Sequence, residues 1–341
     1  MNRKACIVFA TVIILIFGGC AHQSTPRTIS EPPATTRENE SAAPDIDLES
    51  VKPNELGQVM ILAYHEIGKN EARWVRTPDA FRKDLQRLYD LGYRPISLRD
   101  YVTNNIDTEP GKAPVVITFD DSTEGQFRIL PDGSIDPDCA FGILKEFNRK
   151  HPDFPLRATF YVIYPIPFRQ KEHVSRKFQE IIDAGMDIGN HTYSHENLRR
   201  LSTEGAMKEL ALAVREAKRI ESRAIVDSVA LPYGLAPKDE SALKSGRFEE
   251  MSYTNIAALL VGANPAPSPV SPDFDPFRLP RVQAVDPSIA TFGIDQWIRY
   301  FERHPEKRYV SDGDPNTVTV PEALSDMVDQ QKLGGKKLRT Y

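Results

Sequence analysis

Two histidines separated by three residues, His191 and His195, are the clearest candidates for metal ligands in the sequence. At this spacing, one turn of helix or a tight loop can direct both imidazoles at one cation. A carboxylate from another strand would complete a set of two histidines and one acid with an open position, as hydrolytic zinc sites require. An isolated pair of this kind is more often a surface histidine and a helix-terminal histidine, so the interpretation depends on a nearby acid.

Two adjacent carboxylates, Asp120 and Asp121, directly follow the apolar run 115–119. Their negative charges repel each other unless a cation or a shared proton relieves them. Because neighbouring side chains point in different directions, one carboxylate can bind a metal while the other handles a proton. The alternative, a helix N-cap followed by a first-turn acid, fits poorly because a polar loop continues after the pair.

Alternating apolar runs and amphipathic stretches must position these residues. Strands that alternate with helices predict a parallel α/β sheet, and the pattern leaves open whether it is an open sheet or a closed barrel. His65, the two aspartates, His191 and Tyr233 all follow predicted strands, so we expect them at the edge where such folds build active sites. The predicted strands are 59–63, 115–119, 158–162, 186–189, 226–231, 256–261 and 279–282, and the predicted helices are 77–91, 138–150, 174–184, 203–222 and 287–302.

The composition indicates a folded protein that does not bind nucleic acid. Of 341 residues, 40% are hydrophobic and 27% are charged, which is too apolar for a disordered chain. The 43 basic and 48 acidic residues give a net charge of −5, and no stretch is densely basic. Binding through phosphate neutralisation needs such a basic field, so we expect no nucleic-acid partner.

The first twenty residues have the pattern of an export signal. Arg3 and Lys4 precede the apolar run 5–17, and Gly18, Gly19 and Cys20 follow. An apolar core of about 13 residues predicts a secretory signal, because a spanning helix needs about 20. The ending resembles the lipobox of bacterial lipoproteins, with Cys20 as the lipidated residue, although Phe17 replaces the usual leucine. The alternative is an uncleaved anchor, and both tether the protein to a membrane.

These features predict an exported, lipid-anchored protein of the cell envelope, on the periplasmic or outer-membrane side if the source is Gram-negative. Residues 1–20 are the predicted signal, and 21–57, rich in small polar residues and proline, a disordered tether. Residues 58–308 are the predicted catalytic domain. Residues 309–341 are a C-terminal extension too short for an independent core. Cys139 is the one cysteine outside the signal, so we expect a buried thiol and no disulfide.

The segment 118–121 together with 191–195 resembles the polysaccharide deacetylases with the NodB homology domain, carbohydrate esterase family 4. This resemblance implies a deformed (β/α) barrel that removes acetyl groups from N-acetylglucosamine polymers or, in some members, O-acetyl groups from xylan. It implies that Asp120 is the general base and that a metal, usually zinc, is bound by Asp121, His191 and His195.

A third segment, 231–234, matches the family motif in which the backbone N–H of Tyr233 helps to bind the oxyanion. The segments 62–67, 77–81 and 91–97 resemble the poly-N-acetylglucosamine deacetylases, in which a histidine near the N-terminus is the catalytic acid. This resemblance implies that His65 protonates the leaving amine. The alternative is a strand-end histidine satisfied by a backbone carbonyl.

The sequence departs from the family where many relatives have an arginine that orients the base, because Ala230 stands there. Arg281 is a candidate to replace that arginine or to touch substrate, and its alternative is an ordinary surface arginine. Tyr193 is a further candidate for substrate binding, and Tyr64, Trp74 and Tyr161 are weaker ones, because aromatic residues are more often buried.

The sequence therefore predicts a metal-dependent hydrolase that removes N-acetyl groups from an N-acetylglucosamine-containing polysaccharide resembling poly-N-acetylglucosamine, chitin or peptidoglycan. Two alternatives remain open. One is an O-acetyl esterase that acts on acetylated polysaccharide. The other is a non-catalytic polysaccharide-binding lipoprotein with the same fold.

Overall fold

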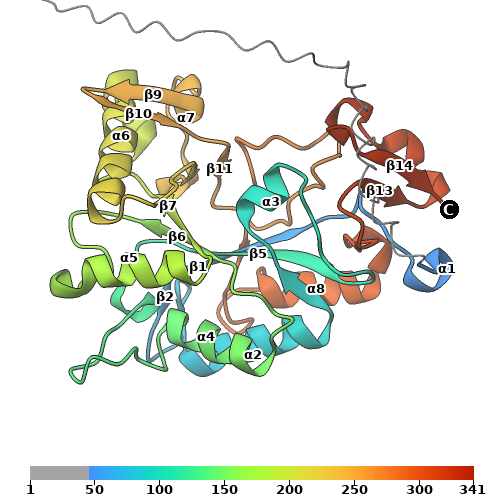
Figure 1. The fold of residues 1–341 in the computed structure, drawn as a ribbon, viewed down its shortest axis with the longest axis horizontal. Helices are drawn as coiled ribbons and strands as arrows, with labels where there is room; N and C mark the ends of the chain where they lie inside the picture. The colour runs from blue at the N-terminus through green and yellow to red at the C-terminus, as the bar shows by residue number, and fades with distance from the viewer. Residues whose placement is uncertain (1–45) are drawn as a thin grey trace, which may run out of the picture. The chain divides into compact units, whose positions relative to one another are not determined.

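A parallel sheet of eight strands forms the centre of the structure (Figure 1). The computed structural model describes residues 46–341, and the predicted signal, Cys20 and residues 21–45 lie outside the described residues. The strand order is β11–β8–β7–β6–β5–β1–β12, and β4 pairs with the first residues of β5. The strands are β1 (Met60–Tyr64), β4 (Tyr93–Pro95), β5 (Ala113–Phe119), β6 (Thr159–Val162), β7 (Asp187–Asn190), β8 (Ser228–Ala230), β11 (Ala257–Leu259) and β12 (Val282–Gln283).

The two ends of this sheet approach each other through the segment that contains β12. Strand β12 pairs with β1, while Leu279, just before β12, forms an isolated parallel bridge with Leu259 of β11. The parallel strands therefore follow a path that closes through a weak seam, which is a deformed (β/α) barrel. Of the two architectures that the sequence pattern left open, the structure has the barrel.

Amphipathic helices connect the strands and pack on the sheet. The predicted helix 77–91 is α2 (Pro78–Asp90), where the Thr77 hydroxyl accepts a hydrogen bond from the Ala80 N–H and proline occupies the first turn. Helices α2, α5 (Val174–Asp183) and α8 (Ile294–Arg303) contact β4, β7 and β12, respectively. The other helices are α1 (Leu48–Val51), α3 (Leu98–Val102), α4 (Ala140–Lys150), α6 (Thr203–Ile220) and α7 (Ser241–Lys244). Within residues 46–341, no helix is both long and apolar enough to cross a membrane.

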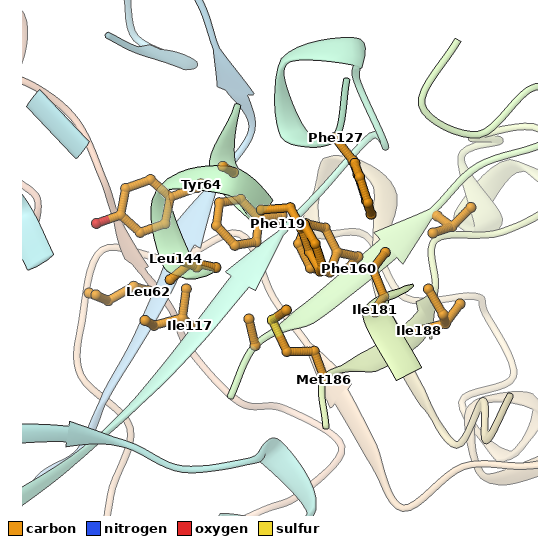
Figure 2. Packing of buried hydrophobic residues seen from close by; sticks show 14 of the residues in the cluster. Leu62, Tyr64, Ile117, Phe119, Phe127, Leu144, Phe160, Ile181, Met186 and Ile188 are labelled. Carbon is orange, nitrogen blue, oxygen red and sulfur yellow. The ribbon is translucent and has the colours of Figure 1, made fainter. Parts of the chain in front are cut away.

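Successive strand residues contribute to two hydrophobic clusters on opposite sides of the sheet. Leu62 and Phe119 belong to the larger cluster, where Phe119 stacks on Phe160 of β6 with ring centroids 4.9 Å apart (Figure 2). Ile61 and Val116 belong to the second cluster. Burial on both faces explains why these strands are continuous apolar runs in the sequence.

Several short elements were not predicted from the sequence, because two to four residues are too few to show a period. Strand β2 (Glu66–Ile67) pairs in parallel with β3 (Val75–Arg76), and β9 (Ser245–Phe248) forms a hairpin with β10 (Met251–Thr254). Cys139 is buried and free, as the cysteine count predicts.

The folded part begins earlier than the predicted boundary at residue 57. Asn54 forms an antiparallel bridge with Val310, and the Asn54 and Glu55 side chains are buried. The C-terminal extension that covers them contains β13 (Thr317–Val320) and β14 (Lys337–Thr340), which pair in parallel. The sequence did not indicate this packing because residues 46–57 bury polar side chains, whereas periodicity reports only apolar ones.

Candidate active site

The predicted catalytic and metal-binding residues lie at the carboxyl ends of the barrel strands. His65 follows β1, Asp120 and Asp121 follow β5, and His191 follows β7. Tyr233 lies in a short 3-10 turn, Pro232–Gly234, that comes after β8. Because the strands are parallel, residues far apart in the sequence meet at one edge of the sheet.

Asp121, His191 and His195 form a candidate metal site. Their ligand atoms all lie within 4.8 Å of one another, and the Oδ1 atom of Asp121 is 3.4 Å from the Nε2 atom of each histidine. The Nδ1 atom of His191 is 2.8 Å from the Ala230 carbonyl oxygen, which directs Nε2 toward Asp121. Metal-binding histidines commonly bond through one ring nitrogen and donate from the other in this way. Two imidazoles and one carboxylate therefore fit a divalent transition metal.

The backbone around this triad adopts left-handed conformations that non-glycine residues rarely take. The φ angles of Asp121, Ser122, Thr192, His195 and Tyr233 are 74°, 44°, 60°, 61° and 60°. Such conformations are costly for residues with a Cβ atom and persist only where surrounding structure imposes them. Their concentration at one edge of the sheet is typical of a functional site.

Asp120 is a buried, charged acid next to the triad. Its carboxylate accepts two hydrogen bonds from the fully buried Arg281, from Nη1 at 2.8 Å and from Nη2 at 2.7 Å. Arg281 Nε also donates to the Leu260 carbonyl oxygen, at 2.9 Å. Burial alone would raise the pKa of Asp120, but the positive charge and hydrogen bonds of Arg281 more than offset it and hold the pKa below its usual value.

This placement decides among the alternatives for Arg281. It is not a surface arginine, because its side chain is fully buried, and its guanidinium faces Asp120 rather than the solvent. The segment before β12 thus supplies a buried cation to Asp120, whereas Ala230 stands where the sequence resemblance implies an arginine.

His65 also lies close to the carboxylate of Asp120. Its Nε2 atom is 3.9 Å from Oδ2 of Asp120, and its ring packs against Trp74 with centroids 4.5 Å apart. In the described part of the chain the ring nitrogens of His65 make no hydrogen bond to a backbone carbonyl. The alternative that His65 is a strand-end histidine satisfied by such a carbonyl therefore has no support there. Burial lowers the pKa of His65, and the charge of Asp120 opposes this shift.

A cleft of about 390 Å³ joins these groups, and Trp74 and Tyr233 form part of its wall. A second hollow, lined by Arg200 and Glu196, shares His195 and Tyr233 with the first. Tyr233 is 62% exposed, and its ring meets the His195 ring edge-on at 5.0 Å.

The aromatic candidates for substrate binding differ in whether they face the cleft. Tyr193 stacks on Tyr164, with centroids 5.9 Å apart, and lines neither of the two hollows. Tyr64 and Tyr161 are buried in the core. Trp74, 38% exposed, is the one among these candidates that faces the cleft.

One buried residue at the site was not predicted from the sequence. Gln126 lies in the loop after β5, and its amide contacts the backbone of both His65 and Asp120. A single glutamine in a polar loop carries no sequence signal for such a contact, which only the folded chain reveals.

A parallel barrel that gathers an arginine-bound acid and a candidate metal triad at its carboxyl edge is suited to metal-assisted hydrolysis. Comparison with known proteins specifies the family: residues 107–247 match the family model described as polysaccharide deacetylase. A Bacillus subtilis (strain 168) protein, YxkH, provisionally named a polysaccharide deacetylase, is 22% identical over 306 residues, which cover 87% of this chain and 99% of YxkH. Residues 107–247 are thus a polysaccharide deacetylase domain, and the matches together support a deacetylase hydrolase.

A solved structure supports the fold. The Streptococcus pyogenes deacetylase PplD in complex with acetate superposes with a TM-score of 0.52 at 20% identity. The match covers 67% of this chain and 92% of PplD. At this identity the likeness establishes the shared barrel fold.

Proposed function

We propose that this protein removes N-acetyl groups from an N-acetylglucosamine-containing polysaccharide that resembles poly-N-acetylglucosamine, chitin or peptidoglycan. The observation that carries the proposal is the buried carboxylate of Asp120, which Arg281 keeps ionised and which lies 4.0 Å from the Nε2 atom of His191. An ionised acid beside a set of metal ligands is suited to accept a proton from water.

We propose Asp121, His191 and His195 as the ligands of zinc or another divalent transition metal. Such an ion, when bound, lowers the pKa of water and polarises an acyl oxygen. His195 and Asp121 are partly exposed, whereas His191 is buried, so the triad opens toward the cleft.

The chain's own residues then account for the proton transfers of amide hydrolysis. Asp120 accepts the proton of the attacking water as the new carbon–oxygen bond forms at the acetyl carbon. The Tyr233 N–H donates to the developing oxyanion, a contact of the type often worth about 10²–10³ in rate. The carbon–nitrogen bond breaks as His65 gives a proton to the departing amine, and acetate and the free amine are released.

The position of His65 suits amide substrates best. An amine leaves only when it is protonated, whereas the sugar alkoxide of an O-acetyl ester is a less basic leaving group that is helped by a proton but depends on it less. A histidine near Asp120 at the cleft therefore supports N-deacetylation ahead of the O-acetyl esterase alternative. The binding-protein alternative rested on the missing motif arginine, and Arg281 supplies an equivalent partner for the acid.

One assay separates these functions. Acetate release is measured with the purified protein on fragments of poly-N-acetylglucosamine, chitin, peptidoglycan and acetyl-xylan. We expect release from N-acetylated fragments to exceed release from acetyl-xylan. Release from acetyl-xylan alone would indicate the esterase, and binding without release from any fragment would indicate the binding protein.

We also propose export and lipid anchoring through Cys20, on the basis of Gly18, Gly19 and Cys20 at the end of the apolar run. Replacing Cys20 with Ala should move the protein from the membrane fraction to the soluble fraction of cells. Retention of the variant in the membrane fraction would support the uncleaved anchor instead.

A further inference from the structure

The side-chain amide of Gln126 connects the two strands that carry His65 and Asp120. Gln126 is fully buried in a 3-10 turn, Glu124–Gln126, after β5. Its Nε2 group donates to the His65 carbonyl oxygen at 2.5 Å and also to the Asp120 carbonyl oxygen. The two acceptors fix the orientation of the amide, since the opposite orientation would place its oxygen against two carbonyls.

These hydrogen bonds lie where the sheet itself stops connecting the two strands. β1 and β5 pair in parallel as far as Tyr64 and Phe119, and the Asp120 N–H donates to the Tyr64 carbonyl oxygen at 2.9 Å. The carbonyls of His65 and Asp120 come directly after this last backbone rung. Gln126 thus adds a side-chain rung between the two residues, and without it both carbonyls would lose a hydrogen-bond donor.

The turn that carries Gln126 is itself fixed against the strand after His65. A Cβ atom on Gly125 would lie 1.9 Å from the Ile67 carbonyl oxygen, so this turn approaches β2 more closely than any side chain would permit. The turn therefore holds Gln126 in a fixed position beside β2 and near the end of β5. Its Oε1 atom makes no hydrogen bond within the described residues, so the amide's polar contacts there are the two carbonyls.

We propose that Gln126 is a positioning residue that sets the separation between the His65 imidazole and the Asp120 carboxylate, now 3.9 Å. The inference rests on the proposed roles of His65 as acid and Asp120 as base. Those roles need both groups to reach the same acetamido group, and an error of about 1 Å in such an arrangement can reduce a rate by about 10²-fold.

The test is Gln126→Met, which keeps the side-chain length and removes the donor. The chain offers a matched control in Gln170, whose amide bonds both the N–H and the C=O of Ile129 in a neighbouring loop, at 2.8 Å and 2.7 Å. Gln170→Met removes a comparable pair of side-chain to backbone bonds that touches neither His65 nor Asp120. Each protein is assayed on an N-acetylglucosamine oligomer and on 4-nitrophenyl acetate, whose leaving group departs without a proton.

We expect Gln126→Met to reduce kcat on the amide by about 10²-fold and kcat on the aryl ester by about 10-fold or less, with KM little changed. Gln170→Met should leave the amide-to-ester ratio at the wild-type value, whatever it does to the melting temperature. An unchanged ratio in Gln126→Met, or a kcat within two-fold of wild type, would overturn the proposal.

Failure of the positioning role of Gln126 and failure of the proposed function give different experimental results. If the wild type releases no acetate from N-acetylated oligomers, the proposed function fails. The same variants are then compared on an alkyl acetate sugar ester and the aryl ester, which again differ in their need for a proton. A selective loss on the alkyl ester would still support the positioning role of Gln126, and an equal loss on both esters would reject it.

Discussion

Two buried carboxyl groups, Asp120 and Glu55, have pKa values shifted in opposite directions, because only Asp120 is hydrogen-bonded to a cation. Their exposed fractions are 1% and 3%. Glu55 accepts hydrogen bonds from the Thr319 N–H at 3.0 Å and the Asp312 N–H at 3.3 Å, and no arginine contacts it in the described part of the chain. Burial and the charge of Asp312 raise the pKa of Glu55 to about 8, whereas Arg281 holds the pKa of Asp120 below its usual value.

The difference shows how the chain assigns roles to buried acids. An acid buried without a hydrogen-bonded cation has a raised pKa and favours its neutral form, as Glu55 does beneath the C-terminal extension. An acid buried against a bidentate guanidinium keeps its charge and remains available as a base. The following substitutions test this contrast, in order of decreasing expected effect.

The largest effect should follow Asp120→Asn, which removes the proposed base and keeps its shape. We expect kcat for acetate release to fall by about 10²–10⁴-fold while metal content, measured by elemental analysis, stays at the wild-type level. Glu55→Gln makes the same chemical change at the other buried acid and should leave kcat unaltered. If Asp120→Asn kept more than a tenth of the activity, Asp120 would not be the base.

Arg281→Met should convert Asp120 into an acid without a partner. Breaking a buried ion pair by removing one member typically costs about 3–5 kcal/mol, because the remaining charge is uncompensated. We expect a loss of this size in the free energy of unfolding, measured by denaturant titration at pH 7. Arg281→Lys, which retains a charge, should recover part of the loss, and a variant as stable as wild type would contradict the assigned ion pair.

Glu55 should make stability fall as the pH rises. Its folded-state pKa is about 8, against an unfolded value near 4.5, so the folded protein binds more protons than the unfolded chain between these two pH values. The free energy of unfolding should therefore decrease across this window, by on the order of a few kcal/mol. Glu55→Gln should flatten the decrease between pH 5 and pH 8, and an identical slope in the two proteins would contradict the assignment.

The smallest effect should come from Lys336→Met. The positive charge of Lys336 partly opposes the raised pKa of Glu55. Its loss should lower the free energy of unfolding at pH 8, where Glu55 is about half ionised, by less than about 1 kcal/mol, and change little at pH 5. A larger loss at pH 5 than at pH 8 would show that Lys336 acts through another contact.

The sequence predicted the elements that are long and apolar. The predicted strand 115–119 is the second part of β5, and predicted helix 77–91 is α2 within one residue at each end. The sequence also predicted that His65, Asp120 and His191 lie at the carboxyl edge of the sheet, because the carboxyl ends of parallel strands share one edge.

Contacts between polar side chains distant in sequence could not be predicted in the same way. Asp120 and Arg281 are separated by 161 positions, and no periodicity specifies which buried cation meets which acid. Gln126 and Glu55 are further examples, since each is polar, buried and defined by backbone partners elsewhere in the chain. Hydrophobic patterns specify faces of elements, whereas these pairings depend on the register of the closed barrel.

The most direct test of the account is a metal titration of the metal-free enzyme. Chelator-treated protein is titrated with Zn²⁺ while acetate release from an N-acetylglucosamine oligomer is measured, with His195→Ala as the comparison. The account predicts that activity is absent without metal, rises in proportion to added Zn²⁺ and saturates at one equivalent, whereas His195→Ala needs far more metal. Full acetate release by the metal-free protein, or stoichiometric Zn²⁺ binding without any acetate release, would contradict it.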